Sequence, residues 1–438
     1  MRVVSLLTLL SRVGGLVRDL VTVRVFGDSV VASSFNAAFA VPNLFRRLFG
    51  EGALSAAFVP EYAQLDKHDH EHASRFASLT VALLTLATSA LLIVIELVLL
   101  AIVVLAPPSE DRALLVHLSM LMMPFMPMVC LTAILGGVLH VHGRFAPTAA
   151  APVLLNLLVI AAAIPSFFTE QPDQVVAAYR IGVAVLVAGS LQVAWALWAL
   201  RGRVRWTRTF QGVGDATRRM LRRFVPVLIG LGTLQLNALL DTLIATWPIL
   251  VGPTIAGVAY PLDDSSNAVL GYTQRLYQFP LGVFGIAVAT AVFPVLARFS
   301  DERGPFVRSL RNGLRLSFFI ALPATVGLML VRDDLVRVVF TGDDRGFSEE
   351  GAARAAAVLL GYAPAVWAYS LNHVLTRGFY ALGDTRTPMR IAVAMVAFNL
   401  TLNLLLIWPL REAGLAWSTA ITATIQFVVP ATLLRRRL

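Results

Sequence analysis

The chain has 438 residues, of which 57% are hydrophobic and only 14% are charged. This composition excludes an ordinary soluble enzyme and indicates a polytopic helical membrane protein. The formal net charge of +10 does not predict nucleic-acid binding, because the basic residues lie in short loops between apolar runs, where the positive-inside rule places them.

Twelve apolar stretches are long enough to cross a membrane as helices, whereas a transmembrane barrel would show alternating segments of about ten residues. In chain order they cover residues 3–26, 31–58, 77–105, 113–140, 146–168, 177–200, 223–247, 265–294, 314–331, 352–380, 389–408 and 413–434. The first stretch begins like a signal peptide, but no small-residue cleavage site follows, so we expect it to be retained as a helix. The prediction is an all-α polytopic membrane protein with about twelve transmembrane helices.

The first two predicted spans contain arginines at depths where a lipid-facing helix does not tolerate them. An arginine near the middle of a bilayer costs roughly 2.5 to 3.5 kcal/mol on insertion scales. We therefore expect Arg12 and Arg18 to line a polar cavity between helices. The alternative is a structural ion pair with Asp19 or Glu51.

Other charges of these two spans have more local explanations. Arg24 lies near the outer end of its helix and can extend to the lipid headgroups. Arg47 and Glu51 are four residues apart and can form an ion pair on one helix face. This pairing leaves Arg46 as the freer cation of the second span, so we assign it to the predicted cavity.

Loop charge predicts the orientation of the chain. The loop at 201–222 and the C-terminal Arg-Arg-Arg-Leu sequence are basic, whereas the loops on the opposite side are acidic or neutral. The positive-inside rule therefore places both termini in the cytoplasm. Another cytoplasmic loop carries His68, His70 and His72, which can take up a divalent metal, but a solvated loop is the simpler interpretation and we predict no metal site.

A weak internal repeat divides the chain into two halves. Residues 138–152 resemble residues 379–392. Six helices in each half give the halves one common orientation, with the substrate route between them. We predict six-helix lobes at 1–200 and 223–438 around a central cavity, joined by the basic linker 201–222.

The second half contains one arginine that no neighbouring acid neutralises. Arg275 lies inside the eighth span with Gln274 and Gln278 as its polar neighbours, and no carboxylate occurs in that helix. Because a guanidinium binds phosphate or carboxylate through two parallel hydrogen bonds, we predict that Arg275 contacts an anionic substrate. The alternative is a buried ion pair with an acid on another helix.

Asp241 is the clearest lone acid inside a predicted span. Asn237 lies one turn earlier, and Asn399 and Asn403 offer oxygen atoms from the eleventh span. An intramembrane carboxylate of this kind can bind a cation or carry a proton. A cation site and a structural hydrogen-bond cluster are both consistent with the pattern.

The sequence contains no nucleophile elbow, Walker A, HExxH or CxxC motif. We therefore predict a transporter rather than an enzyme, with no organic cofactor, driven by Na⁺ or by the membrane potential. A non-transporting scaffold or receptor is the competing class. Proline-bent helices, two halves and uncompensated charge inside the spans argue against it.

Five motifs in order resemble the MurJ/MviN family of lipid II flippases, within the multidrug/oligosaccharidyl-lipid/polysaccharide exporter superfamily. They are SRVGGLVRD, VPNLFRRLFGEGALSAAFVP, GRFAPTAAAPVLLN, QRLYQFPLGVFGIAVATAVFPVLAR and GFYALGDTRTP. The resemblance implies a flippase that moves lipid II, the undecaprenyl-diphosphate-linked peptidoglycan precursor, by alternating access from the cytoplasmic to the outer leaflet of the bacterial inner membrane. It also implies that Arg12, Arg18, Arg46 and Arg275 are the functional arginines.

The chain departs from the usual family pattern at several positions. Ser33 stands where an aspartate is common, and Gln274 and Gln278 stand where members carry acids. Members usually have fourteen helices, so the family's last two helices are lacking from the twelve predicted here. The sodium site of some members is similar to Asp241 with the asparagines of the eleventh span, although Asn403 occupies a position that is usually acidic there.

The cargo admits one alternative within the same fold, which is another polyprenyl-linked oligosaccharide or a drug-like molecule. Four cavity arginines argue against a cationic drug. We expect a monomer, because both halves of the route are present in one chain.

Overall fold

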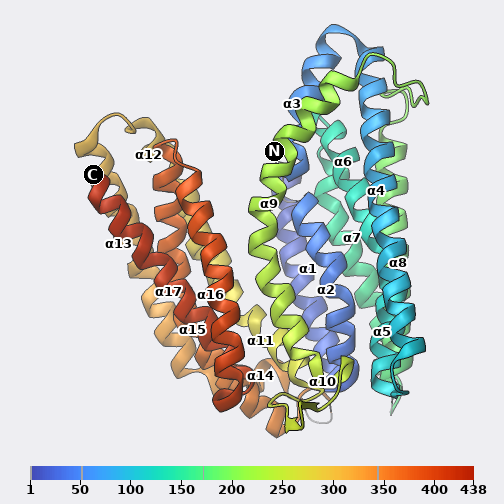
Figure 1. Ribbon diagram of the computed structural model, residues 1–438, viewed down its shortest axis with the longest axis vertical. Helices are drawn as coiled ribbons and strands as arrows, with labels where there is room; N and C mark the ends of the chain where they lie inside the picture. The colour runs from blue at the N-terminus through green and yellow to red at the C-terminus, as the bar shows by residue number, and fades with distance from the viewer. Residues whose placement is uncertain (1, 51–52, 171, 343–344) are drawn as a thin grey trace. The chain divides into compact units, whose positions relative to one another are not determined.

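The computed structural model describes residues 2–50, 53–170, 172–342 and 345–438, which are mostly helical, as the sequence predicts. The helices up to residue 245 are α1 (Arg2–Phe26), α2 (Val30–Gly50), α3 (Ala53–His68), α4 (His70–Leu105), α5 (Glu110–Met122), α6 (Phe125–Val141), α7 (Ala146–Ala163), η1 (Ile164–Phe167), α8 (Gln174–Ala199) and α9 (Gly214–Ala245) (Figure 1). Those that follow are α10 (Trp247–Leu250), α11 (Ser266–Pro280), η2 (Leu281–Gly285), α12 (Ile286–Arg298), α13 (Arg303–Leu330), α14 (Arg332–Phe340), α15 (Glu349–Ala381), α16 (Arg386–Leu410) and α17 (Glu412–Arg437).

A small β-hairpin interrupts the helices between α10 and α11. Strands β1 (Thr254–Ile255) and β2 (Val258–Ala259) pair antiparallel. Its two-residue turn places Ala256 at φ 50° and Gly257 at φ 83°. Glycine adopts such angles readily, whereas alanine does so at a cost. The two strands of this hairpin are a short exception to the all-α prediction.

The chain forms two compact units. The first contains residues 1–26 and 30–235, and the second contains residues 27–29 and 236–438. Helix α9 therefore contributes its first part to one unit and its last part to the other. The turn at 27–29 belongs to the second unit because Asp28 accepts hydrogen bonds there from the backbone N–H (3.0 Å) and the hydroxyl (2.6 Å) of Ser348.

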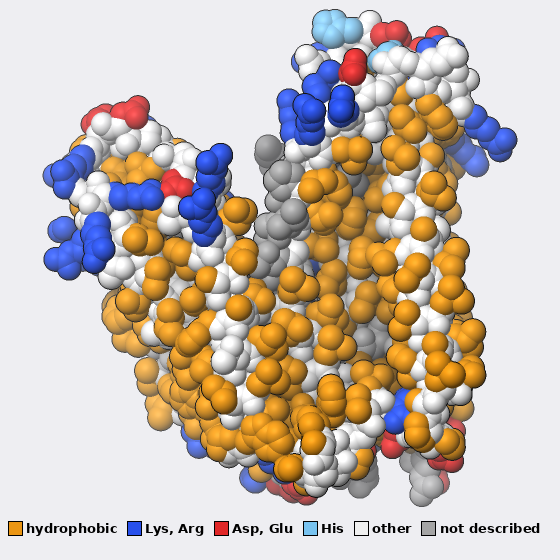
Figure 2. Space-filling model, in the orientation of Figure 1, with side chains coloured by type: hydrophobic (Ala, Val, Ile, Leu, Met, Phe, Trp, Pro, Cys, Tyr) orange, Lys and Arg blue, Asp and Glu red, His pale blue; other side chains and the backbone are white. Residues whose placement is uncertain are grey.

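Eight helical stretches of the described chain are long and apolar enough to span a membrane. They are His70–Leu105, Glu110–Val141, Ala146–Phe167, Gln174–Ala199, Ser266–Arg298, Arg303–Leu330, Arg386–Leu410 and Glu412–Arg437. Figure 2 shows apolar side chains along the length of the helices and many charged side chains near their ends. The four other predicted spans fall on α1, on α2 with α3, on α9 and on α15, which are helical but more polar, so their crossing of the membrane stays a prediction.

Three predicted spans are divided between helices, one of them (265–294) at the π-helical turn η2 between α11 and α12, and two at other junctions. The 31–58 span is shared by α2 and α3, and the 113–140 span is interrupted between α5 and α6. The second interruption lies at Pro124, which has no N–H to continue the helical hydrogen bonding. The His-rich loop is also a helix junction, since α3 ends at His68 and the carboxylate of Asp69 caps the N-terminus of α4.

Helix α15 is the central element of the second unit. Its buried residues include Leu375 and Phe379, which join a hydrophobic cluster with Leu310 of α13 and Leu434 of α17. Helices α11 and α12 and the single π-helical turn η2 between them all pack against α15. A side chain at Gly285, the last residue of η2, would place its Cβ 2.5 Å from the hydroxyl of Ser370, so this close approach requires glycine.

A buried ionic cluster holds the hairpin end of the second unit. Arg354 of α15 pairs with Asp263 at 2.8 Å and with Glu412 of α17, and both Arg354 and Glu412 are largely buried. The hydroxyl of Ser266 also donates to Glu412 at 2.6 Å. The cluster ties the segment before α11 to α15 and α17, and a buried carboxylate such as Glu412 requires these partners.

Candidate functional site

The charged network of α1 lies inside the first unit. The guanidinium of Arg18 donates to the carboxylate of the adjacent Asp19, from Nη2 at 2.7 Å and from Nε at 3.0 Å. A third donor, Nη1, contacts the side-chain oxygen of Asn156 on α7 at 3.2 Å. Arg18 therefore has the local partner Asp19 that the sequence offered as the alternative to a cavity position, and its side chain is still 23% exposed.

Asn156 holds α1 and α7 together at this point. Its amide donates to the backbone carbonyl of Ser11 at 3.0 Å while its oxygen accepts from Arg18. Asn156 is 5% exposed and lies beside Gly14 and Gly15 of α1. Asn156 ends the GRFAPTAAAPVLLN motif, but its sequence context alone indicates no role for it.

Arg46 of α2 faces a cavity within the first unit. Its Nε donates to the side-chain oxygen of Asn43 at 2.9 Å, one turn earlier on the same helix. The cavity has a volume of about 180 Å³ and is also lined by His140 of α6 and Thr148 of α7, whose polar atoms lie 2.8 Å apart. The guanidinium thus borders a small cavity with further hydrogen-bonding groups.

The remaining charges of α1 and α2 lie in different settings. Arg12 is exposed and Arg24 is half-buried. Arg47 is half-buried, and its predicted partner Glu51 lies outside the described residues, so this pairing stays a prediction. In the first unit, the structure places Arg18 in an ion pair and Arg46 at a cavity.

Arg275 lies on α11 in the second unit. Its guanidinium stacks over the ring of Tyr272, one turn earlier, at 5.2 Å from the ring centroid. Tyr272 in turn packs against Phe340 and Phe347, with centroids 6.4 and 6.0 Å away. The aromatic cluster packs against the face of α11 that carries Tyr272, the residue under the Arg275 guanidinium.

The structure brings Asp241 together with the two asparagines of α16. The amide of Asn403 donates to the carboxylate of Asp241 at 2.6 Å and to the side-chain oxygen of Asn399 at 3.3 Å. The amide of Asn399 reaches the hydroxyl of Thr422 on α17 at 3.4 Å. Thr422 was not predicted from the sequence, where a threonine in an apolar run is ordinary.

This cluster is rich in oxygen atoms that lack donors. The side-chain oxygens of Asn403 and of Asn237 are buried without a hydrogen-bond partner among the described residues. Hard cations such as Na⁺ prefer carboxylate, amide and hydroxyl oxygens as ligands. The described residues contain no group of three or more His, Cys, Asp or Glu side chains placed to hold a metal ion.

A family model described as lipid II flippase MurJ matches residues 22–438 of this chain. A probable lipid II flippase MurJ of Rhizobium tropici is 32% identical over 443 residues, which cover 98% of this chain and 79% of that protein. A probable lipid II flippase MurJ of Rhizobium meliloti (strain 1021) is 34% identical over 424 residues, which cover 93% of this chain and 75% of that protein.

Solved structures show the same fold. A structure of lipid II flippase MurJ in an inward closed conformation has a TM-score of 0.82 at 23% identity and covers 99% of this chain and 88% of its own. An inward-facing multidrug resistance MATE family transporter of the MOP superfamily has a TM-score of 0.77 at 15% identity, with 97% and 95% covered. The fold is therefore that of the membrane transporters of this superfamily.

Proposed function

This chain belongs to the lipid II flippase MurJ family, and we propose that it translocates lipid II across the bacterial inner membrane by alternating access. It is a multi-pass membrane transporter and not an enzyme, and it serves peptidoglycan synthesis. The observation that carries the function is the family match over residues 22–438.

The arginines Arg12, Arg18, Arg46 and Arg275 are proposed to bind the anionic groups of the substrate. A diphosphate and peptide carboxylates fit the planar donor fork of arginine. The contacts of Arg18 support this role, because Asp19 and Asn156 orient the guanidinium while leaving part of it exposed. An arginine without such contacts would lose more side-chain freedom on binding.

The Asp241 cluster is proposed to couple transport to a cation, with Na⁺ as the candidate and the membrane potential as a further driving force. Support comes from the oxygens of Asp241, Asn237, Asn399 and Asn403, two of which are buried without donors among the described residues. A bound cation would satisfy these oxygens and neutralise the carboxylate within the apolar part of the protein.

The proposed topology has twelve transmembrane helices in two six-helix lobes at 1–200 and 223–438, with the linker 201–222 and both termini in the cytoplasm. Loop charge supports this orientation. In the first unit, the buried Glu61 pairs with Arg219 and Arg223 at 3.2 and 3.5 Å, which fastens the start of α9 to α3. We propose that the chain acts as a monomer.

Rescue of a bacterium depleted of its own lipid II flippase tests the proposed function. Expression of this chain is expected to restore growth and cell shape, and absence of rescue by protein that is present in the membrane would contradict the proposal.

A transport assay in vesicles tests the cargo. Equal transport of lipid II and of a polyprenyl-diphosphate sugar without a peptide would favour another polyprenyl-linked oligosaccharide.

A further inference from the structure

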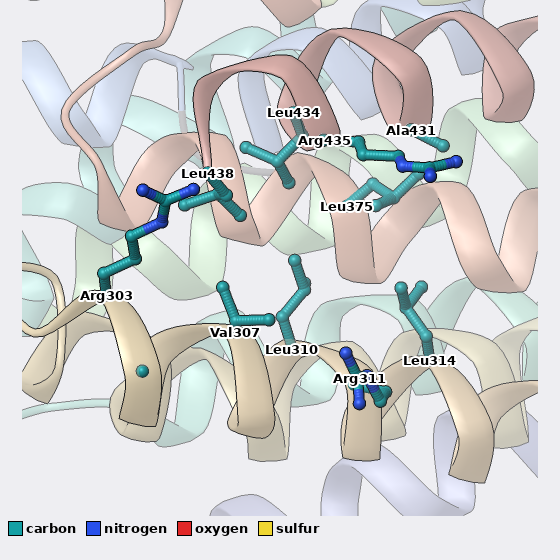
Figure 3. Close-up of a pocket in the computed structure, with 11 residues that line it drawn as sticks. Arg303, Val307, Leu310, Arg311, Leu314, Leu375, Ala431, Leu434, Arg435 and Leu438 are labelled. Atoms are coloured by element: carbon teal, nitrogen blue, oxygen red, sulfur yellow. The ribbon is translucent and has the colours of Figure 1, made fainter.

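The second unit contains an apolar pocket between α13, α15 and α17, separate from the Asp241 cluster and from Arg275. Its volume is about 720 Å³, within the range of about 300–1,000 Å³ that is common for ligand sites. Figure 3 shows the apolar side chains that line it, which are Val307, Leu310, Leu314, Leu375, Ala431, Leu434 and Leu438. Leu310, Leu375 and Leu434 also belong to the core of this unit, so the floor of the pocket is rigidly packed.

Three arginines border the same pocket. Arg303 and Arg311 come from α13 and Arg435 comes from α17, and the apolar side chains lie between them (Figure 3). All three are exposed, and none has a hydrogen bond or an ion pair with another described residue. The nearby Arg437 differs, because it pairs with Asp384. The three arginines thus keep their full capacity for an external anion.

The arrangement follows the depth profile of a membrane. Arg303 is the first residue of one candidate span and Arg435 is close to the end of another, so both lie where helices leave the apolar layer. The apolar lining extends from these residues toward Leu314 and Leu375, deeper along α13 and α15. Arg303 and Arg435 therefore stand at the helix ends with apolar lining below them, and Arg311 lies about two turns farther along α13, beside Leu310 and Leu314. Two cationic groups at the surface with apolar groups below them suit the headgroup and the chain of a lipid.

We propose that this pocket binds one anionic glycerophospholipid of the surrounding membrane. Its phosphate would accept hydrogen bonds from Arg303, Arg311 and Arg435, and one acyl chain would lie along Leu310, Leu314 and Leu434. Basic pockets between transmembrane helices at the cytoplasmic side are suited to anionic headgroups, and guanidinium groups bind phosphate in bidentate fashion. A soluble phosphate would leave the apolar part of the pocket uncovered, so charge and shape together favour a lipid.

Native mass spectrometry of the purified full chain with added phosphatidylglycerol or phosphatidylcholine tests this site. The triple variant Arg303→Gln, Arg311→Gln and Arg435→Gln, called the rim variant, removes the three positive charges that border the pocket. The matched control Arg308→Gln, Arg315→Gln and Arg436→Gln removes the same charge from the same two helices at residues that do not line the pocket. We expect the rim variant to bind phosphatidylglycerol about tenfold more weakly than the unmodified chain does, and the control variant to bind it within about twofold of the unmodified chain. The unmodified chain should bind phosphatidylcholine about tenfold more weakly than phosphatidylglycerol.

A second variant tests the apolar part with the rim intact. Val307→Trp places a large side chain in the pocket from a half-buried position, and we expect it to weaken phosphatidylglycerol binding while thermal unfolding of the chain remains cooperative. Equal losses in the rim and control variants would overturn the proposal in favour of diffuse attraction to basic helix ends. Equal binding of the two lipids, or binding of glycerol phosphate as tight as that of the lipid, would overturn it as well.

Discussion

The two units hold their internal charges in opposite ways. In the first unit, the Arg18 guanidinium has an adjacent carboxylate, Asp19, and a neutral amide, Asn156. In the second unit, the Asp241 carboxylate receives an amide donor from Asn403, and no lysine or arginine of the described chain pairs with it. A partly neutralised cation is suited to an exchangeable anion, whereas a carboxylate among neutral oxygens is suited to a cation. The comparison suggests a division of labour between substrate binding and coupling.

Removal of the first-unit cation should have the largest effect. Arg18→Ala is expected to lower lipid II transport in vesicles about 10- to 100-fold, because hydrogen bonds to charged groups contribute about 1.5–3 kcal/mol. Arg24→Gln on the same helix is the control and should retain most transport. Equal loss in both variants would mean that α1 requires its charges for folding rather than for the substrate.

Neutralisation of the second-unit acid should have the next largest effect. Asp241→Asn keeps the shape and the contact with α16 but removes the charge that a cation requires. We expect transport to fall about tenfold, in line with the loss of one charged interaction, and stimulation by a Na⁺ gradient to disappear. The measurement compares Na⁺ with choline at a fixed membrane potential, and an unmodified chain indifferent to Na⁺ would refute the sodium assignment.

Loss of the Asn156 bridge, which lies in the first unit, should have a smaller effect on transport. Asn156→Ala leaves the Ser11 carbonyl and one donor of Arg18 without their partner, which costs about 1–3 kcal/mol of stability. We expect transport to fall about three- to tenfold through mispositioned Arg18. In the Arg18→Ala background the further loss should vanish, and persistence of the full effect there would show that Asn156 acts independently of Arg18.

Asp384, in the loop between α15 and α16, contrasts with Asp241, and its substitution should have the smallest effect, which is on the pH dependence of stability. The hydroxyl and backbone N–H of Thr387, at 2.6 and 2.9 Å, and the guanidinium of Arg437 lower the pKa of Asp384 to about 2. The unfolded chain protonates this group near its ordinary pKa of about 3.9. The contribution of Asp384 to stability is therefore present above about pH 4 and is lost as the pH falls toward about 2.

Thermal unfolding at pH 5, 3 and 2 tests this assignment. The unmodified chain should lose up to about 1 kcal/mol more than Asp384→Asn over this range, since the group is close to solvent. Identical pH profiles of the two chains would show that the loop contacts do not stabilise the folded protein.

Several features of the site could be predicted because their signal is local. Arg18 and Asp241 stand out as charges in apolar runs, and the desolvation cost of such a charge can be recognised before its partner is known. The positions of the long helices follow in the same way from apolar length. The pairing of Arg18 with Asp19 was also accessible as an alternative, because the two residues are adjacent.

Other features depend on contacts between distant segments. Asn156 is 138 residues from Arg18, and Asn403 is 162 residues from Asp241, so the partner of each amide follows only from the fold. A polar residue in an apolar helix is equally compatible with many neighbours. The turn of the β-hairpin was missed for another reason, since Ala256 is not a residue type that favours a positive φ.

The π-helical turn η2 sets the rotational register of the helix that follows it. The N–H of Ile286 bonds to the carbonyl of Leu281, five residues earlier, so this turn holds one residue more than an α-helical turn. Deletion of one residue within η2 would leave a continuous helix but rotate every later side chain by about 100°. Ala289 and Leu296, now buried, would turn away from the core. At this position the number of residues, more than their hydrophobicity, decides which face of α12 meets α15.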